Sequence, residues 1–192
     1  MNRFGWIILT LLFAGGVLVF RSNDAQKTSP TILEKSSVET ASLQLGALPV
    51  PVVGVSPDAL IDTWNQSRDG GVRGHQAIDI PAPMGTPVVA TMAGRVEKMH
   101  QSERGGLTAY VRDTTGRWLT YYAHLAGYAA GLREGQTIRV GERIGFVGDT
   151  GNAGAGNTHL HFALHRMAPG ERWYQGAPVN PYPLLAGKRD AR

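Results

Sequence analysis

Short runs of β-branched and aromatic residues, separated by polar, glycine-rich turns, make up most of the chain after Leu60. No segment there repeats its apolar residues every 3.6 positions, which favours strands over helices. The predicted strands are residues 86–93, 95–99, 107–112, 118–123, 137–140 and 143–147. A turn at residues 113–117 should join a hairpin, and a tight pair is expected between 137–140 and 143–147. The pattern predicts one compact, mostly β, antiparallel domain over residues 48–185.

The chain that precedes these strands is less regular. Residues 50–55 are expected to form an edge strand or an extended entry segment, because proline cannot donate to a sheet ladder. Residues 57–64 should form a short turn or helix. Residues 65–74 have the composition of a polar, glycine-rich loop that leads into His75.

The first 21 residues are predicted to be a targeting segment. Arg3 precedes an apolar run that ends at Phe20, close to the shortest length that spans a bilayer, about 17 residues. A cleaved signal peptide and a retained anchor both fit, but the polar residues after Phe20 lack a small-residue cleavage pattern, which favours an anchor. Residues 22–47 should form a flexible linker with at most a short weak helix, and residues 186–192 a basic tail.

Composition narrows the chemistry that the chain can carry. The absence of cysteine excludes disulfides and thiolate metal sites, and leaves His, Asp and Glu as possible metal ligands. A net charge of +4, without basic runs interleaved with aromatic residues, argues against nucleic-acid binding.

His159 and His161 form the strongest chemical signal. In a strand, alternate side chains share a face, so both imidazoles should project from one side while Leu160, Phe162 and Leu164 enter a core on the other. The alternative is a solvated strand face that happens to carry histidine. A pair of histidines one step apart on a common face favours a site over that alternative.

Three further residues could complete such a site. His75 and Asp79 lie four positions apart, and the prolines at 81 and 83 argue against a helix, so an extended segment should present both on one face. Taken alone, the two would fit a surface histidine before a turn, and His124 would fit a solvated strand end.

Two other histidines are not expected to bind metal. His165 shares the face of His161 but lies about 13 Å further along the strand, too far for a common ion. His100 is surrounded by polar residues and is expected in an exposed loop.

The joint occurrence of the remaining groups predicts a zinc site. A catalytic zinc ion commonly has three protein ligands and one open position for water. Two histidines and one aspartate leave the ion with a charge of about +1, which suffices to acidify water and polarise a carbonyl. The other histidines would then transfer protons. Spacing alone does not choose between His159 and His161 as the ligand.

Several ordered motifs from about Val50 to Pro183 make the chain resemble the lysostaphin-type (LytM-like) zinc endopeptidases, which cut the peptide part of bacterial peptidoglycan. The motifs are H-x-x-x-D at His75 and Asp79, IPAPMGTPV at 80–88, YAHL at 122–125, GFVGDTGN at 145–152, HLHF at 159–162 and PVNP at 178–181. The resemblance implies a groove over the sheet that holds the active site.

Carried over by this resemblance, His75, Asp79 and His161 are the ligands of one zinc ion whose fourth ligand is water. His124 and His159 are then the pair that moves protons and stabilises the oxyanion. The chain departs from the family pattern at two places: Ala77 stands where glycine is usual, and the sequence of residues 111–113 differs from the common one. The alanine methyl should be tolerated if φ at Ala77 is negative.

The resemblance predicts an exported, periplasmic or cell-envelope enzyme, anchored in the inner membrane, that acts on peptidoglycan. Some members of the family have lost ligands and activate other wall hydrolases, so a silent binding or activating module is the main alternative. A zinc peptidase for small secreted proteins is a third possibility. Residues 64–74 enter beside the site and could act as a gate. The bond that is cut and any regulatory partner are not readable from the sequence.

Overall fold

The computed structural model describes residues 45–188. The predicted targeting segment, residues 1–21, and most of the predicted linker and basic tail lie outside this range. Within it, no helix has the length and hydrophobicity needed to span a bilayer.

Strands dominate this part of the chain and the helices are single turns, so the prediction of a mostly β domain is confirmed. The strands are β1 (Ser67–Arg68), β2 (Arg73–Gly74), β3 (Ile78–Pro81), β4 (Pro87–Val89), β5 (Gly94–Ser102), β6 (Gly106–Asp113), β7 (Trp118–Tyr128), β8 (Thr137–Ile138), β9 (Arg143–Val147), β10 (His159–Arg166) and β11 (Ala177–Val179). The helical turns are η1 (Pro57–Ala59), η2 (Asp69–Gly71), η3 (Gly151–Ala153) and α2 (Tyr182–Leu185).

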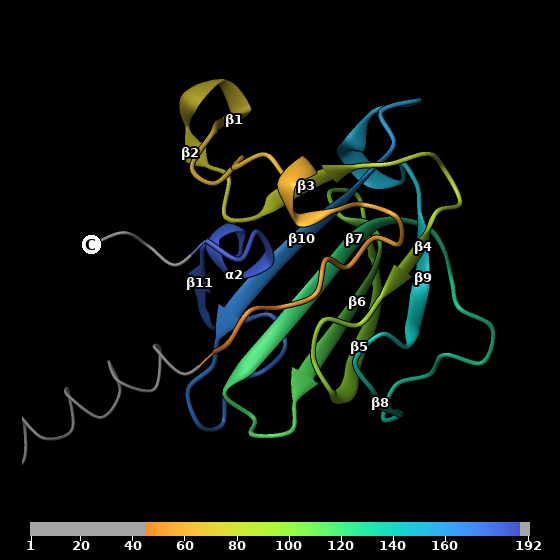
Figure 1. The fold of residues 1–192 in the computed structure, drawn as a ribbon, viewed down its shortest axis with the longest axis vertical. Coiled ribbons are helices and arrows are strands. Elements are labelled where there is room, and N and C mark those ends of the chain that lie inside the picture. The colour runs from red at the N-terminus through yellow and green to blue at the C-terminus, as the bar shows by residue number, and fades with distance from the viewer. Residues whose placement is uncertain (1–44, 189–192) are drawn as a thin grey trace, which may run out of the picture. The chain divides into compact units, whose positions relative to one another are not determined.

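All but two of these strands form one antiparallel sheet, in which β10 and β7 are central (Figure 1). The main order is β11-β10-β7-β6-β5-β8, while β3 also pairs with β10, and β9 links β7 to β4. The short strands β1 and β2 pair only with each other. Because β10 is flanked by β3 on one side and β7 on the other, residues far apart in the sequence meet along it.

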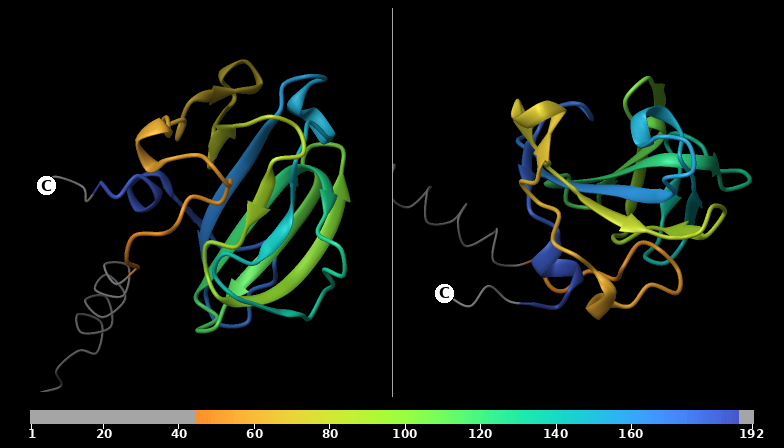
Figure 2. Two further views of the ribbon diagram at one scale, coloured as in Figure 1. Left: turned by 45° about the vertical axis from the view of Figure 1, so that its right-hand side comes forward. Right: turned by 90° about the horizontal axis from the view of Figure 1, so that it is seen from above.

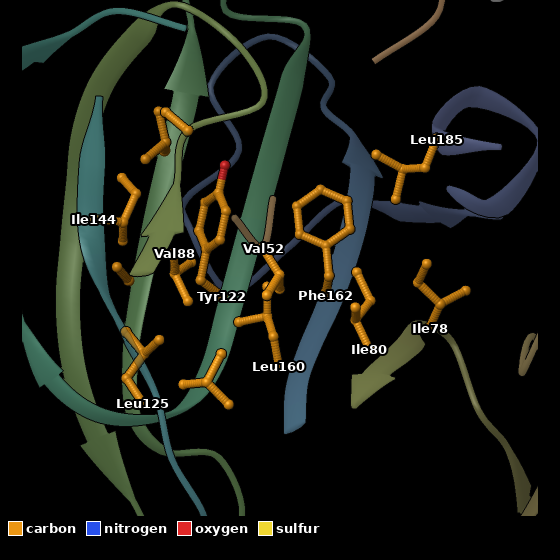
Figure 3. Close-up of a cluster of buried hydrophobic side chains, with 14 of the residues drawn as sticks. Val52, Ile78, Ile80, Val88, Tyr122, Leu125, Ile144, Leu160, Phe162 and Leu185 are labelled. Atoms are coloured by element: carbon orange, nitrogen blue, oxygen red, sulfur yellow. The ribbon is translucent and has the colours of Figure 1, made fainter. Parts of the chain in front are cut away.

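The sheet is strongly curved and encloses its own hydrophobic core (Figure 2). Side chains from β4 and β9 pack in one cluster with those from β5, β6, β7 and β10. Figure 3 shows Leu160 and Phe162 of β10 on the same side as Tyr122 of β7, whose ring lies 5.4 Å from that of Phe162. All three are fully buried. Full burial of each such side chain stabilises the fold by about 2 to 3 kcal/mol.

The hairpin predicted around residues 113–117 is confirmed between β6 and β7. The Asp113 carboxylate accepts the backbone N–H groups of Thr115 and Trp118. Gly116 adopts a φ of 74°, which glycine reaches without steric cost. Side chain and glycine together close the turn.

Two local predictions differ from the structure. The prediction that residues 137–140 pair with 143–147 is wrong, because β8 pairs with β5 while β9 pairs with β4 and β7. Residues 65–74 contain the small β1–β2 hairpin and are not simply a loop. Of the two forms predicted for residues 50–55, the structure has the extended entry segment, with a single bridge from Val52 to Val88, because a turn at Gly54 ends the pairing.

Candidate metal centre

The alternating pattern of β10 places two imidazoles on one face of the sheet. Leu160, Phe162 and Leu164 are fully buried in the core, whereas His159 and His161 point to the opposite side. The two neighbouring strands then bring in the rest of the site. Asp79 of β3 lies opposite His161 in the register, and Ala123, the residue before His124, lies opposite it on β7.

Three groups converge closely enough to share one metal ion. Nδ1 of His161 lies 3.0 Å from Oδ1 of Asp79 and 3.1 Å from Nε2 of His75. Nε2 of His75 lies 3.2 Å from the same Asp79 oxygen. Zinc bonds of about 2.0 to 2.2 Å at tetrahedral angles place ligand atoms about 3.3 to 3.6 Å apart, so a shift of a few tenths of an ångström would admit the ion. These three residues therefore form a possible zinc site.

Thr63 orients two of these three groups. Its carbonyl oxygen lies 2.9 Å from Nδ1 of His75, and because a carbonyl can only accept, that nitrogen carries the proton and Nε2 is free to bind a metal. The Thr63 hydroxyl accepts the backbone N–H of Asp79 at 2.9 Å. Such contacts behind the ligands fix ring orientation and metal affinity.

Arg68 of β1 holds the outer oxygen of the candidate carboxylate ligand. Its Nη2 donates to Oδ2 of Asp79 at 2.5 Å, while Oδ1 of the same carboxylate faces the two histidines. The same Nη2 lies 3.2 Å from Nδ1 of His75, which is a contact and not a second hydrogen bond, because that nitrogen already donates to Thr63. The β1–β2 hairpin thus braces the candidate metal centre from outside the main sheet.

His124 is directed into the site by a distortion of β7. Opposite the single residue Thr108, β7 places Ala123 and His124, a β-bulge, and His124 adopts a φ of 60° that is rare for residues other than glycine. Its N–H donates to the carbonyl of Gly105 at 2.9 Å, and its Nδ1 donates to the carbonyl of Thr150 at 2.7 Å. The unprotonated Nε2 is the atom left for chemistry.

His159 is held in the same way and faces His124. Its Nδ1 donates to the carbonyl of Asn157 at 2.8 Å, and its Nε2 lies 3.8 Å from Oδ1 of Asp79. The ring centroids of His159 and His124 are 4.9 Å apart. Two imidazoles with free Nε2 atoms therefore stand beside the three candidate ligands. The geometry separates the two histidines of β10, which the sequence alone left equivalent.

Burial and contact set the charge of these groups. Burial would raise the pKa of Asp79, but hydrogen bonds and charge from His161 and His75 outweigh it and hold that pKa well below its usual range. Burial lowers the pKa of His161, and lowers that of His124 to about 4. At neutral pH Asp79 is therefore a carboxylate, and the imidazoles of His124 and His161 are neutral, the forms that bind metal and accept protons.

The centre opens into a groove of about 440 Å³. The β1–β2 hairpin supplies one wall, and the turn between β5 and β6 together with η3 supplies the other, with Tyr121 edge-on to His161 at 5.8 Å between ring centroids. The side chains of Asp79 and His161 each keep 23% exposure, so residues 64–74 form a wall and do not close the site. This argues against the gate suggested by the sequence.

A family comparison connects this geometry to known proteins. The model of peptidase family M23 matches residues 73–181, which include all five predicted site residues. The chain belongs to peptidase family M23. Its fold is also that of the catalytic domain of lysostaphin from Staphylococcus simulans, with a TM-score of 0.55 and 23% identity over 66% of this chain and 92% of that one. LytU matches with a TM-score of 0.53 and 27% identity over 64% of this chain and 80% of that chain.

Curated M23 relatives differ in what they do. The L-Ala–D-Glu endopeptidase of Bacillus subtilis is 36% identical over 129 residues, which span 64% of this chain and 38% of that protein. The murein hydrolase activator NlpD of Salmonella typhimurium is 31% identical over 138 residues, 68% of this chain and 33% of the activator. The chain thus matches only a minor part of each relative.

The M23 domain places the remaining histidines away from the centre. His165 lies at the far end of β10, opposite Pro178 of β11. The prediction of an exposed loop at His100 is wrong: the residue lies in β5 and is half-buried, with its ring centroid 5.2 Å from that of Trp173. The prediction that β7 stops at His124 is also wrong, since the strand continues to Tyr128 beyond the bulge.

Several residues that hold the side chains of the M23 site in place were not predicted from the sequence. Thr63 and Arg68 lie in segments interpreted only as turn and loop, and the carbonyls of Thr150 and Asn157 carry no residue-specific signal. The only sequence signal for this part of the site was the position of Arg68, seven residues before His75. Ala77, which departs from the family pattern, is fully buried without a positive φ, so its methyl group is accommodated.

Proposed function

We propose that this M23 protein is a zinc-dependent endopeptidase that hydrolyses peptide bonds in peptidoglycan stem peptides or cross-links. The observation that carries the proposal is the convergence of three ligand atoms and two free imidazole nitrogens on one groove. The endopeptidase named among the relatives supports the substrate class. His75, Asp79 and His161 would hold the metal, with water in the fourth position.

The chain's own residues supply the proton transfers. Zinc in this position would acidify a water molecule and polarise the carbonyl of the scissile bond. Nε2 of His124 is unprotonated because Nδ1 is committed to Thr150, so it can accept a proton at neutral pH. Nε2 of His159 faces the same space. Once protonated, either imidazole can donate to the departing amine or to negative charge on the carbonyl oxygen.

A second candidate function is activation of another wall hydrolase without catalysis. The similarity to the activator NlpD favours it. In favour of catalysis, this chain retains all five site residues, and they converge around an accessible groove. Both candidates act at the same cell structure.

We also propose that the protein is exported and acts in the periplasm or cell envelope, with residues 1–21 as an inner-membrane anchor. The apolar run between Arg3 and Arg21 supports this location, as does a substrate found only outside the cytoplasm. A linker of roughly 25 residues would reach about 25 to 30 Å as a flexible coil, which gives an anchored domain access to the wall.

The test is digestion of purified sacculi by the full-length, zinc-loaded protein in mild detergent, with mass spectrometry of the released fragments. We expect defined peptides whose release stops with a zinc chelator and resumes when zinc is restored. The His124→Ala variant serves as the control for contaminating hydrolases. Absence of release from folded, zinc-loaded protein, together with stimulation of a separate hydrolase, would favour the activator.

A further inference from the structure

The walls of the groove carry arginine on both sides of the candidate metal centre. Arg68 and Arg73 come from the β1–β2 hairpin, and Arg104 comes from the turn between β5 and β6. Among the described residues that line the groove, Asp79 is the only carboxylate, and it belongs to the metal centre. A bound divalent cation would add to this positive charge. The groove is therefore suited to an anionic substrate.

Arg104 is the arginine whose charge is available. Arg68 already donates to Asp79. The guanidinium of Arg104, by contrast, has no hydrogen-bond or ion-pair partner within residues 45–188, and its side chain is exposed. An exposed, unpaired arginine on the rim of a groove keeps all five N–H donors free for a carboxylate.

The backbone that carries Arg104 is fixed relative to the catalytic face. The carbonyl of Arg104 accepts the N–H of Asn152 at 3.0 Å, and the carbonyl of the next residue, Gly105, accepts the N–H of His124 at 2.9 Å. Gly105 packs so closely that an added Cβ would lie 2.3 Å from the hydroxyl of Tyr121. The turn is thus held by the same contact that directs His124, so the backbone of Arg104 has a defined position beside His124.

Resting on the function proposed above, we propose that Arg104 is a specificity residue that binds a free carboxylate of the substrate peptide, on the His124 side of the scissile bond. The substrate class is an acidic stem peptide whose carboxylate near that bond is not amidated. A neutral bridge made only of glycine offers no such group. Amidation keeps the size of the carboxylate but removes its charge, so it should weaken binding at this position.

The test compares matched substrates with the full-length, zinc-loaded protein. The probes are stem-peptide dimers with free glutamate and diaminopimelate carboxylates, and the same dimers with each carboxylate converted in turn to a primary carboxamide. At low ionic strength we expect one amidation to raise KM about tenfold with little change in kcat, as for loss of one partly exposed charge-assisted hydrogen bond. Arg104→Ala should raise KM for the acidic dimer to the value for that amide, and Arg104→Lys should restore part of the preference.

Arg139→Ala is the control for net charge, because Arg139 is exposed and does not line the groove. It should keep the full preference for the acidic dimer. Equal KM values for acidic and amidated dimers in the natural protein, or an unchanged preference in Arg104→Ala, would overturn the role of Arg104 while leaving the endopeptidase intact.

Failure of the proposed function gives a different result, since no dimer would then be cut. In that case a measurement of binding affinity still tests whether Arg104 binds the carboxylate. Calorimetric titration of the acidic dimer and its amides into the natural protein and Arg104→Ala should show the same roughly tenfold preference, lost in the variant. Equal affinities would exclude a carboxylate subsite at Arg104.

Discussion

Replacement of Thr63 by valine should weaken both the fold and the metal centre. The hydroxyl of Thr63 accepts the Asp79 N–H at 2.9 Å, and its carbonyl accepts Nδ1–H of His75 at 2.9 Å. Valine nearly reproduces the shape of threonine but lacks the hydroxyl, so the change removes the first contact only. The N–H of Asp79 then has no acceptor, and the carboxylate loses part of its positioning.

The expected magnitude follows from burial. A typical hydrogen bond contributes about 1 kcal/mol net, and a buried N–H left without a partner costs about 1 to 3 kcal/mol. Thr63 and Asp79 are only half-buried, so water can partly replace the hydroxyl, and we expect a loss of about 1.5 kcal/mol. In a domain of this size the melting temperature falls by about 3 to 6 °C. Contacts behind a metal ligand also contribute to affinity, so zinc binding should weaken about tenfold.

The assay combines thermal unfolding of the metal-free protein with competition for zinc against a fluorescent chelator. Thr63→Ser is the matched control, because it keeps the hydroxyl and loses only a methyl group. Thr63→Ser should lie close to the natural protein in zinc affinity, with Thr63→Val clearly below both. Equal zinc affinity and equal melting temperature in the two variants would refute the bracing role of the hydroxyl.

Three further predictions concern the candidate metal centre and the turn beside it. His161→Ala should lose stoichiometric zinc, whereas His124→Ala should keep zinc, measured by metal analysis, and lose hydrolysis by about 10²- to 10⁴-fold; an active His161→Ala protein would contradict the ligand set. Because burial lowers the pKa of His124 to about 4, below its ordinary value of 6.5, the contribution of this residue to the stability of the metal-free protein should be fully present above pH 6.5. That contribution is lost as pH falls toward 4. In denaturant titrations, the free energy of unfolding should therefore decline less steeply with falling pH in His124→Ala than in the natural protein; identical slopes in the two proteins would contradict this prediction. Gly106→Ala should destabilise the fold by at least about 2 kcal/mol, because φ there is 61° and an added Cβ would lie 2.1 Å from Oγ1 of Thr150. Gly127→Ala, with no atom within 4 Å of its added Cβ, should be close to neutral in the same unfolding measurement.

The parts of the fold that follow from local rules were predictable. Strand alternation has a period of two residues, so the sequence of β10 sufficed to separate Leu160 and Phe162 from the two histidines. The hairpin at residues 113–117 was equally local, because its turn depends on one aspartate and one glycine. The absence of cysteine and the small number of histidine candidates limited the ligand types before any geometry was known.

Strand pairing was not predictable in the same way. β8 and β9 are close in sequence and separated by a turn, yet each pairs with a strand from elsewhere. Which strands become neighbours depends on how the whole sheet closes around its core, and that is a property of many distant residues at once. A pattern confined to a few positions contains no information on it.

The sequence by itself limited the possible metal ligands to histidine, aspartate and glutamate, and it determined which face of β10 carries the two histidines. Only the tertiary structure decided which nitrogen of His75, His124 and His159 faces the groove. That choice rests on the carbonyls of Thr63, Thr150 and Asn157, and on a bulge that turns His124 inward. Backbone carbonyls are the same in every residue, so their positions, and hence the proton on each ring, follow from the folded chain and not from the identity of the residues that carry them.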